Sequence, residues 1–261
     1  MKRPKAAFAL RRGTVRLVRL LLPGPCFACG RPIPGRPYLG ACASCWSALR
    51  PLGWRGCPQC GLPRPGGSDA LGPAGLPCGE CLQRSPTPHP MCAAVLYRGT
   101  ARRFLLRAKS GRPELLDPLG DQLAEALGPG GFATDRSCVC FVPAHPFRRL
   151  RRGFNPAERL ARRVASALTL PLRRFTTVHA LRHGSPAKGR TAFERLTGAR
   201  RFKPLLGATG ERVLLVDDVL TTGATARDCA TALLESGARS VHLAVWARAL
   251  PRFDRSSGGL L

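Results

Sequence analysis

Two aspartates, Asp217 and Asp218, stand side by side in a chain of 261 residues that has only 15 acidic residues. They follow the apolar run Val213–Val216, and small or hydroxyl-bearing residues come soon after them, at Thr221, Thr222, Gly223, Ala224 and Thr225. Carboxylate oxygens accept hydrogen bonds from sugar hydroxyls and bind hydrated Mg²⁺. Small residues ahead of a helix let backbone N–H groups point at a phosphate, and threonine hydroxyls and the helix N-terminus add donors and partial positive charge. The segment therefore predicts a site for a ribose 5-phosphate group.

A simpler interpretation explains each of these residues separately. In it, Asp218 is a turn residue and the threonines cap a helix. That interpretation does not explain why the acids, the apolar residues and the threonines occur in this joint order. We therefore favour the ligand site.

Cysteines form the second chemical pattern in the chain. Eight of the twelve lie in four Cys-x-x-Cys motifs: Cys26 and Cys29, Cys42 and Cys45, Cys57 and Cys60, Cys78 and Cys81. Two such motifs offer four sulfur ligands to one tetrahedral Zn²⁺, and the intervals of 12 residues between the first two motifs and 17 between the last two are typical of zinc ribbons. We expect about two structural zinc ions, with redox-active dithiols as the alternative. Spacing leaves open whether neighbouring or alternate motifs share a metal.

The charge of the chain is strongly positive. Lysine and arginine number 42, which gives a formal net charge of +27. Such a charge favours salt-dependent binding of a polyanion such as single-stranded DNA. Only five of these residues are lysine, however, and arginine-rich composition is also typical of GC-rich genomes. The charge leaves both explanations open.

Strands and helices are expected to alternate after residue 90. Strands are expected at 91–99, 138–142, 213–216 and 241–247, and helices at 100–109, 117–127, 156–168 and 224–235, with a basic loop between 142 and 156. This alternation predicts an α/β fold with a mostly parallel sheet covered on both faces. The two aspartates fall where the strand 213–216 should end, and ligands of open α/β sheets bind at that edge.

The chain is expected to have four parts: a basic N-terminal helix at 1–24, a double zinc ribbon at 25–90, the α/β domain at 91–250 and a tail at 251–261. Arginines interrupt the apolar residues of the first part, so it does not resemble a secretory signal. That helix is expected to pack on the protein's own body, or else to contact a membrane surface or a partner. No stretch approaches about 18 uninterrupted apolar residues, so we expect no transmembrane segment and a cytoplasmic protein.

The order of residues from Val213 to Thr225 resembles the phosphoribosyl pyrophosphate motif of type I phosphoribosyltransferases. Both have four apolar residues, two acids, two apolar residues and then Thr-Thr-Gly-x-Thr. The resemblance implies that Asp217 and Asp218 meet the ribose hydroxyls, that 221–225 hold the 5′-phosphate, and that Mg²⁺ accompanies the ligand. It also implies a sheet of the type I phosphoribosyltransferase kind.

A second resemblance covers most of the chain. The run 140–161, CFVPAHPFRRLRRGFNPAERLA, resembles the ComF family, whose members also carry Cys-x-x-Cys ribbons ahead of a transferase-like domain. The matching residues are Val142, Pro143, Arg149, Arg152, Gly153, Phe154 and Asn155, with Tyr97 to Gly99 and Lys109 further upstream. The resemblance implies that pyrophosphate is received by Pro143, Ala144, His145 and Arg152. The simpler alternatives are that His145 is an exposed turn residue and that the basic loop is only solvated.

The residues from His179 to Lys203 correspond to the flap that closes over the reaction in type I enzymes. The family shows a Thr-Pro-x-Gln run followed by Arg and Asn, whereas this chain has Ser185, Pro186, Ala187 and Lys188, then Arg195 and Thr197. Arg195 is a catalytic candidate together with the two aspartates. Because the Gln and the Asn are missing, the sequence leaves open whether transfer is catalysed.

Three functions are consistent with these patterns. The first is a ComF-like protein that binds phosphoribosyl pyrophosphate or a related ribose 5-phosphate compound and acts in DNA uptake during natural transformation. The second is an active nucleobase phosphoribosyltransferase of nucleotide salvage, in which a nitrogen nucleophile displaces pyrophosphate from C1 of the ribose. The third is a non-catalytic module that binds single-stranded DNA or docks uptake or recombination proteins.

Overall fold

The computed structural model describes residues 25–33, 40–49, 52, 57–62, 77–78, 81–82, 89–128, 132–178, 202–205 and 207–250. The expected N-terminal helix, the tail 251–261 and Arg195, with most of the expected flap, lie outside the described residues. Among the helices of the described ranges, none combines the length and the apolar character needed to cross a bilayer.

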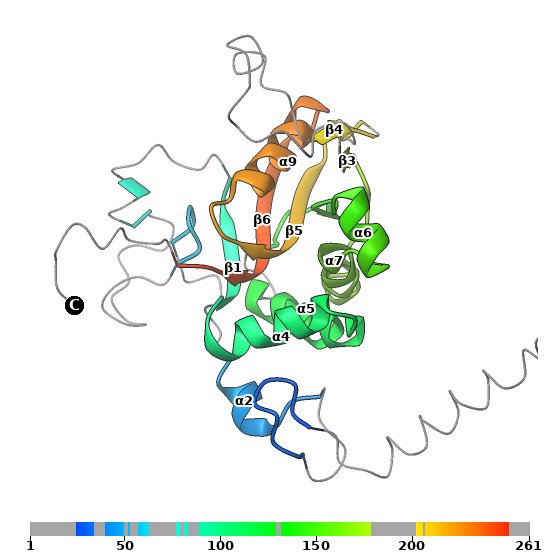
Figure 1. Cartoon of the computed structure of the whole chain (residues 1–261). Helices are drawn as coiled ribbons and strands as arrows, with labels where there is room; N and C mark the ends of the chain where they lie inside the picture. The colour runs from blue at the N-terminus through cyan, green and yellow to red at the C-terminus, as the bar shows by residue number, and fades with distance from the viewer. Residues whose placement is uncertain are drawn as a thin grey trace, which may run out of the picture.

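Four parallel strands form the central sheet, in the order β1-β6-β5-β2 (Figure 1). They are β1 (Met91–Leu96), β2 (Cys138–Phe141), β5 (Arg212–Leu220) and β6 (Ser240–Arg248). All three pairings, β1 with β6, β6 with β5, and β5 with β2, are parallel. The expected α/β fold with a mostly parallel sheet is confirmed.

Alternate strand residues enter two separate hydrophobic cores, one on each face of the sheet. Leu214 and Trp246 belong to the first core, whereas their neighbours Leu215 and Val245 belong to the second. The first face is covered by α5 (Leu116–Leu127) and α7 (Pro156–Ala167), and the second by α9 (Ala224–Glu235), as Figure 1 shows. Burial on both faces explains why strand β5 is an almost continuous apolar run rather than an alternating one.

Helices α5 and α7 pack unusually closely. Gly120 of α5 makes this approach possible, because a Cβ atom there would lie 2.6 Å from the Cβ of Arg163 and 3.2 Å from the carbonyl oxygen of Leu160. Two arginines of α7 reach across to α5, where Arg159 binds Asp117 and Arg163 binds Asp121, each through two hydrogen bonds of 2.7–2.9 Å.

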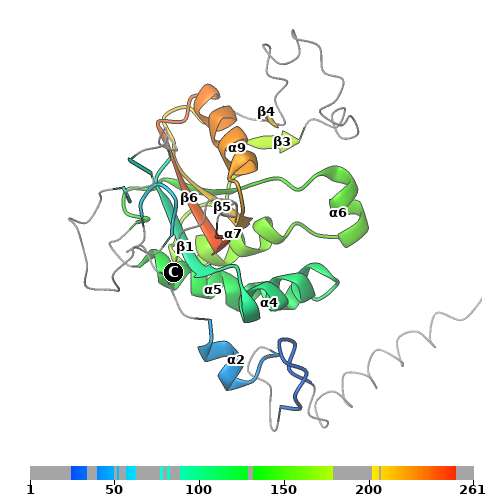
Figure 2. The ribbon, with the colours of Figure 1, turned by 60° about the vertical axis from the view of Figure 1, so that its left-hand side comes forward.

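The described cysteine-rich residues, 25–33 and 40–49, contact the first core, in part through α2 (Ala43–Ser47). Figures 1 and 2 show α2 on the far side of α4 (Gly99–Lys109) from the sheet. The short helix η1 (Pro113–Leu115) follows α4 in the chain and leads into α5. Trp46 meets Phe104 of α4 edge to face, with ring centroids 6.0 Å apart. Gln122 joins the two parts, since it accepts from the indole N–H of Trp246 and donates to the carbonyl of Leu49.

Three local expectations were wrong or incomplete. The expected basic loop contains a helix, α6 (Pro146–Arg152), which starts at a proline and ends at a left-handed Gly153. The helix has only seven residues, and its two apolar side chains, Phe147 and Leu150, are exposed, so the segment is too short for a helical period to be recognised in its sequence. A separate antiparallel pair, β3 (Thr176–Val178) and β4 (Phe202–Pro204), was not predicted. Strand β5 also continues past Val216, because β6 pairs with it as far as Leu220.

Candidate functional site

The candidate site lies at the carboxyl edge of the sheet, where β5 extends beyond β2. The pairing of β2 with β5 ends at Val216, whose carbonyl accepts from the Val142 amide, and Pro143 then has no N–H to continue the ladder. The exposed side of β5 opens onto a cavity of about 230 Å³. Its lining is formed by Lys109, residues 142–145, Arg148, Arg152, Asn155, Pro156, Val178, Phe202 and residues 217–226.

The two aspartates of the pocket have different environments. Asp218 forms an ion pair with Lys109 of α4, with both carboxylate oxygens 2.9 Å from Nζ. Asp217 instead accepts a hydrogen bond from the Asp218 amide at 2.8 Å. Burial, and then the charge of Asp218, raise the pKa of Asp217 to about 8. Near neutral pH Asp217 is therefore largely protonated.

The loop that follows β5 leads directly into α9. Gly223 has φ +79 and stands at the N-cap of the helix, a backbone conformation that favours glycine. Because the N-cap is a glycine, it has no side chain to accept hydrogen bonds from the first turn of the helix. The hydroxyl of Thr222 accepts a long hydrogen bond of 3.4 Å from the Ala224 amide. The start of α9 consequently faces the cavity with its partial positive charge.

The Arg-Gly-Phe-Asn run joins the other wall of the pocket to the core. Gly153 ends α6 at φ +78, and Phe154 packs against the first core. Asn155 is buried, caps α7 by accepting from the Ala157 amide, and donates from Nδ2 to the Val142 carbonyl at 3.0 Å. The motif thus fastens the end of β2 to the start of α7 and fixes the turn that lines the pocket.

The structure gathers most of the predicted ligand-site residues around this single pocket. Both aspartates, the residues 221–225, and Pro143, Ala144, His145 and Arg152 all line it. Arg149 and Arg151 of α6 do not line it, and Arg195 is outside the described residues. Lys109 was noted only as a family resemblance, and Arg148 not at all. Lys109 comes from α4, far from the other site residues in the sequence, and nothing in the basic run distinguishes Arg148 from Arg149 and Arg151, which do not line the pocket.

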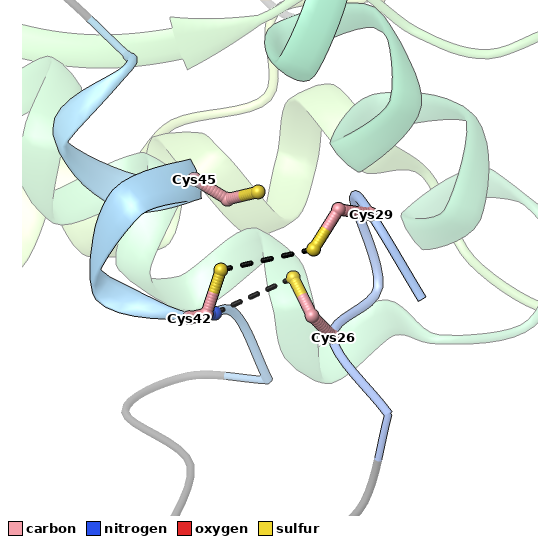
Figure 3. Close-up of side chains that lie close together, drawn as sticks. All are labelled: Cys26, Cys29, Cys42 and Cys45. Atoms are coloured by element: carbon pink, nitrogen blue, oxygen red, sulfur yellow. Dashed lines mark hydrogen bonds between the residues drawn. The ribbon is translucent and has the colours of Figure 1, made fainter. Parts of the chain in front are cut away.

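The first four cysteines form one cluster. The thiols of Cys26, Cys29, Cys42 and Cys45 point toward one another in Figure 3, and all four sulfurs lie within 4.8 Å of each other. Sulfurs bound to one tetrahedral zinc at about 2.3 Å are separated by about 3.8 Å. The Sγ atoms of Cys29 and Cys42 are 3.8 Å apart, which fits a shared metal and is far too long for a disulfide bond.

The second four cysteines, Cys57, Cys60, Cys78 and Cys81, repeat this arrangement. In each cluster the amide of the first cysteine donates to the backbone carbonyl of the residue five positions later. The amide of a glycine four positions later donates to the carbonyl of the same cysteine. In each, the first cysteine's sulfur accepts an amide bond from the third, at 3.4 Å for Cys26 and 3.2 Å for Cys57. Neighbouring motifs therefore pair, and the residues of both clusters fit structural zinc.

Comparisons with known proteins agree with both parts. A double zinc ribbon domain model matches residues 17–82, and a phosphoribosyl transferase domain model matches residues 150–258. The chain is 32% identical over 240 residues to the "DNA utilization protein YhgH" of Salmonella typhi, which covers 87% of this chain and 97% of the relative. It is 25% identical over 218 residues to "Competence protein F" of Haemophilus influenzae, covering 80% and 91%.

Solved structures with a similar arrangement include the glutamine phosphoribosylpyrophosphate amidotransferase of B. subtilis, at 25% identity and a TM-score of 0.37. That match covers 50% of this chain and 25% of the other. The identity to YhgH extends over nearly the whole of both chains and includes the cysteine-rich and the transferase-like parts. The chain therefore belongs to the ComF family of DNA utilization and competence proteins, with a double zinc ribbon ahead of a phosphoribosyltransferase domain.

Proposed function

We propose that the chain binds phosphoribosyl pyrophosphate, or a related ribose 5-phosphate compound, in the pocket at the carboxyl edge of the sheet, and that it acts in DNA uptake. The observation that carries this proposal is that one cavity is lined both by the acid pair Asp217–Asp218 and by the loop 221–225. The printed names of the relatives, DNA utilization and competence proteins, support the cellular role.

Each wall of the pocket suits a different part of such a ligand. The acid pair presents oxygens, and one proton, to the ribose hydroxyls. The start of α9 and the threonines suit the 5′-phosphate. Across the cavity, Arg148 and Arg152 place positive charge where a pyrophosphate group would extend.

Magnesium fits the chemistry of this pocket as a companion of the ligand. Carboxylate and phosphate oxygens are the ligands that Mg²⁺ prefers, and the ion would supply positive charge to the pyrophosphate. The ion pair with Lys109 already compensates Asp218. The protein's own contribution is therefore to hold the sugar and the 5′-phosphate.

Calorimetry with phosphoribosyl pyrophosphate and Mg²⁺ tests this proposal. We expect binding by the unaltered protein and its loss in the double variant Asp217→Asn/Asp218→Asn, because the ribose loses both carboxyl groups and with them the charged acceptor at Asp218. Asp228→Asn is the matched control, since Asp228 is exposed on α9 and does not line the pocket. Absence of binding by the unaltered, folded protein would refute the ligand assignment. If the protein binds the ligand, a screen for pyrophosphate release across nucleobases distinguishes binding alone from catalysed transfer.

A second candidate function, binding of single-stranded DNA, is favoured by helix α6. Figure 2 shows this helix projecting from the body. Phe147 is 67% exposed and Leu150 is 83% exposed, and they alternate with four arginines at 148, 149, 151 and 152. Exposed rings on which bases stack, interleaved with arginines that meet phosphates, are how proteins bind single strands without sequence preference. The arginines at 148 and 152 continue this surface into the pocket.

Fluorescence anisotropy with a single-stranded oligonucleotide tests this surface. We expect Phe147→Ala to weaken binding by about tenfold, because stacking contributes about 1–3 kcal/mol per base. Arg149→Ala should lower the salt dependence of binding, since each lost phosphate contact reduces the slope by about 0.7. Arg239→Ala, which removes an exposed arginine just before β6 at the opposite edge of the sheet, is the control for charge alone. Equal effects of the two arginine variants would contradict a specific surface on α6.

A further inference from the structure

Arg248, the last residue of β6, is only 8% exposed. Its guanidinium donates to four backbone carbonyls. Nε donates to Cys60 at 2.7 Å, and Nη1 lies 3.1, 2.6 and 2.7 Å from the carbonyl oxygens of Leu220, Thr221 and Ala249. One side chain therefore bridges the second cysteine cluster and the first residues of the loop that lines the ligand pocket.

Both ends of this bridge are held in place. At the metal end, the Met91 amide donates to the Pro58 carbonyl at 2.6 Å, and Gly61 has φ +68. A Cβ atom on Gly61 would lie 3.0 Å from Sδ of Met91, so the cysteine turn packs tightly against strand β1. At the pocket end, the Ala249 amide donates to the Leu220 carbonyl at 2.9 Å, so the end of β6 is fastened to the end of β5.

The charge of Arg248 needs compensation that the nearby carbonyls supply only in part. Among the described residues it has no carboxylate partner in an ion pair. A zinc ion bound by four cysteine thiolates carries a net charge of about −2. A loaded second cluster would therefore place negative charge next to this buried guanidinium and compensate its positive charge.

We propose that Arg248 is a positioning residue that couples the second metal site to the ribose-phosphate loop. With zinc bound by Cys57, Cys60, Cys78 and Cys81, the Cys60 carbonyl would be held in place. Arg248 links that carbonyl to those of Leu220 and Thr221 and so keeps the loop in the shape that receives the 5′-phosphate. The inference rests on the proposed ligand for its effect on affinity. The coupling itself is a property of the chain.

The first cluster provides the contrast that makes this coupling specific. It also contacts the body, through the bond from Arg103 of α4 to the Ala28 carbonyl and the contact of Trp46 with Phe104. None of the hydrogen bonds made by its four cysteines reaches Leu220 or Thr221. Loss of metal from the two clusters should therefore affect the pocket loop differently.

The primary test is Arg248→Lys in the full chain, with zinc content and circular dichroism measured on the same sample. Lysine keeps the charge but cannot span four carbonyls, because a compact ammonium replaces the planar fork of donors. We expect the affinity for phosphoribosyl pyrophosphate to fall by about tenfold or more, the change expected for losing a charge-assisted hydrogen bond. Zinc content should be unchanged. Arg136→Lys is the matched control, because Arg136 donates to Ser240 at the other end of β6.

Hydrogen exchange of the amides from Leu220 to Gly223 tests the coupling without any ligand. We expect faster exchange in Arg248→Lys and in the second-cluster variant Cys78→Ser/Cys81→Ser than in the first-cluster variant Cys42→Ser/Cys45→Ser. Combining Arg248→Lys with Cys78→Ser/Cys81→Ser should add little, because both changes break the same link.

The outcomes separate this inference from the proposed function. If the unaltered protein does not bind phosphoribosyl pyrophosphate, the ligand assignment fails, and the exchange rates still decide whether Arg248 couples the two sites. Unchanged exchange at Leu220–Gly223 in a folded, zinc-loaded Arg248→Lys protein would overturn the coupling. Equal acceleration by the first-cluster and second-cluster variants would overturn it as well.

Discussion

At the scale of single residues, the pocket depends on two adjacent aspartates that have different environments. Lys109 comes from a helix more than 100 residues earlier in the chain and binds Asp218 through both oxygens. Asp217 is left next to a charged neighbour in a desolvated position, and the pKa of Asp217 rises to about 8. The pair therefore combines an acceptor with a group that can donate, which suits two vicinal hydroxyls.

The raised pKa of Asp217 predicts how stability depends on pH. In the folded chain this carboxyl keeps its proton up to about pH 8, whereas in the unfolded chain it loses the proton near its ordinary pKa of about 4. The folded state binds more protons between these values, so the contribution of Asp217 to stability falls as the pH rises from about 4 to 8. Asparagine cannot ionise. We therefore expect the melting temperature of Asp217→Asn, relative to the unaltered protein, to increase as the pH is raised across this range.

Thermal denaturation in magnesium-free buffer at several pH values measures this difference. Other titrating groups are common to both proteins and largely cancel in the comparison. Asp228→Asn, on the exposed side of α9, should show no such trend. A constant difference between Asp217→Asn and the unaltered protein at all pH values would show that Asp217 titrates in the same range in both states.

At the scale of elements, the pocket depends on where paired elements stop. β2 ends at Phe141 and Pro143 closes its ladder, while β6 carries β5 on to Leu220, and the difference in length opens the cavity. The wall opposite is held by α7, whose cap Asn155 also binds Val142. The packing of α7 on α5 therefore supports one side of the site.

That packing predicts the effect of adding one methyl group. In Gly120→Ala, the new Cβ would meet Arg163 and the Leu160 carbonyl, and backbone atoms cannot easily move away. Overpacking costs about 1–3 kcal/mol, and the 2.6 Å approach to the Cβ of Arg163 places this substitution in the upper part of that range, while the better helix propensity of alanine offsets about 1 kcal/mol. We expect a net loss of roughly 1–2 kcal/mol in the free energy of unfolding by urea denaturation. Glu125→Ala, at an exposed position of the same helix, is the control, and a Gly120→Ala protein as stable as that control would contradict the close approach.

At the scale of the whole molecule, the cysteine clusters are joined to the α/β body. The first cluster shares a hydrophobic core with α4 and α5, and Gln122 joins it to Trp246 in the centre of the sheet. The second cluster packs beside β1 and reaches the pocket loop through Arg248. Metal binding and folding of the body are therefore expected to be linked.

This linkage predicts a stoichiometry and a stability. Metal analysis of the purified protein should find about two zinc ions per chain, and Cys42→Ser/Cys45→Ser should retain about one. The same variant should melt at a lower temperature than the unaltered protein. Metal binding stabilises the local fold from which Trp46 and Leu49 contact the body, so loss of the metal weakens these contacts. A metal-free protein that is fully folded and melts at the same temperature would refute structural zinc.

The sequence by itself determined those features that are encoded by residues close together in the chain. The mostly parallel α/β sheet, the positions of the strands β1 and β2 and of the helices α4, α5, α7 and α9, and the family were accessible because apolar runs and motifs are contiguous in the chain, whereas the order of the strands was not. The acid pair and the threonine loop were found for the same reason, since thirteen consecutive residues carry them. The four Cys-x-x-Cys motifs were equally local, but their spacing was compatible with two pairings.

Only the tertiary structure decided which distant groups meet. It showed that neighbouring cysteine motifs pair and that Lys109 forms an ion pair with Asp218. It also showed that the side chain of Arg248, at the end of β6, donates to the carbonyls of both Cys60 and Thr221. It further showed that the basic residues 146–152 form a helix. This helix buries none of its residues and has only seven of them, so its sequence shows no clear helical pattern. The physical reason is the same in each case. Local spacing constrains the backbone of a segment, whereas ion pairs and hydrogen bonds between distant segments follow from how the helices and the sheet pack together.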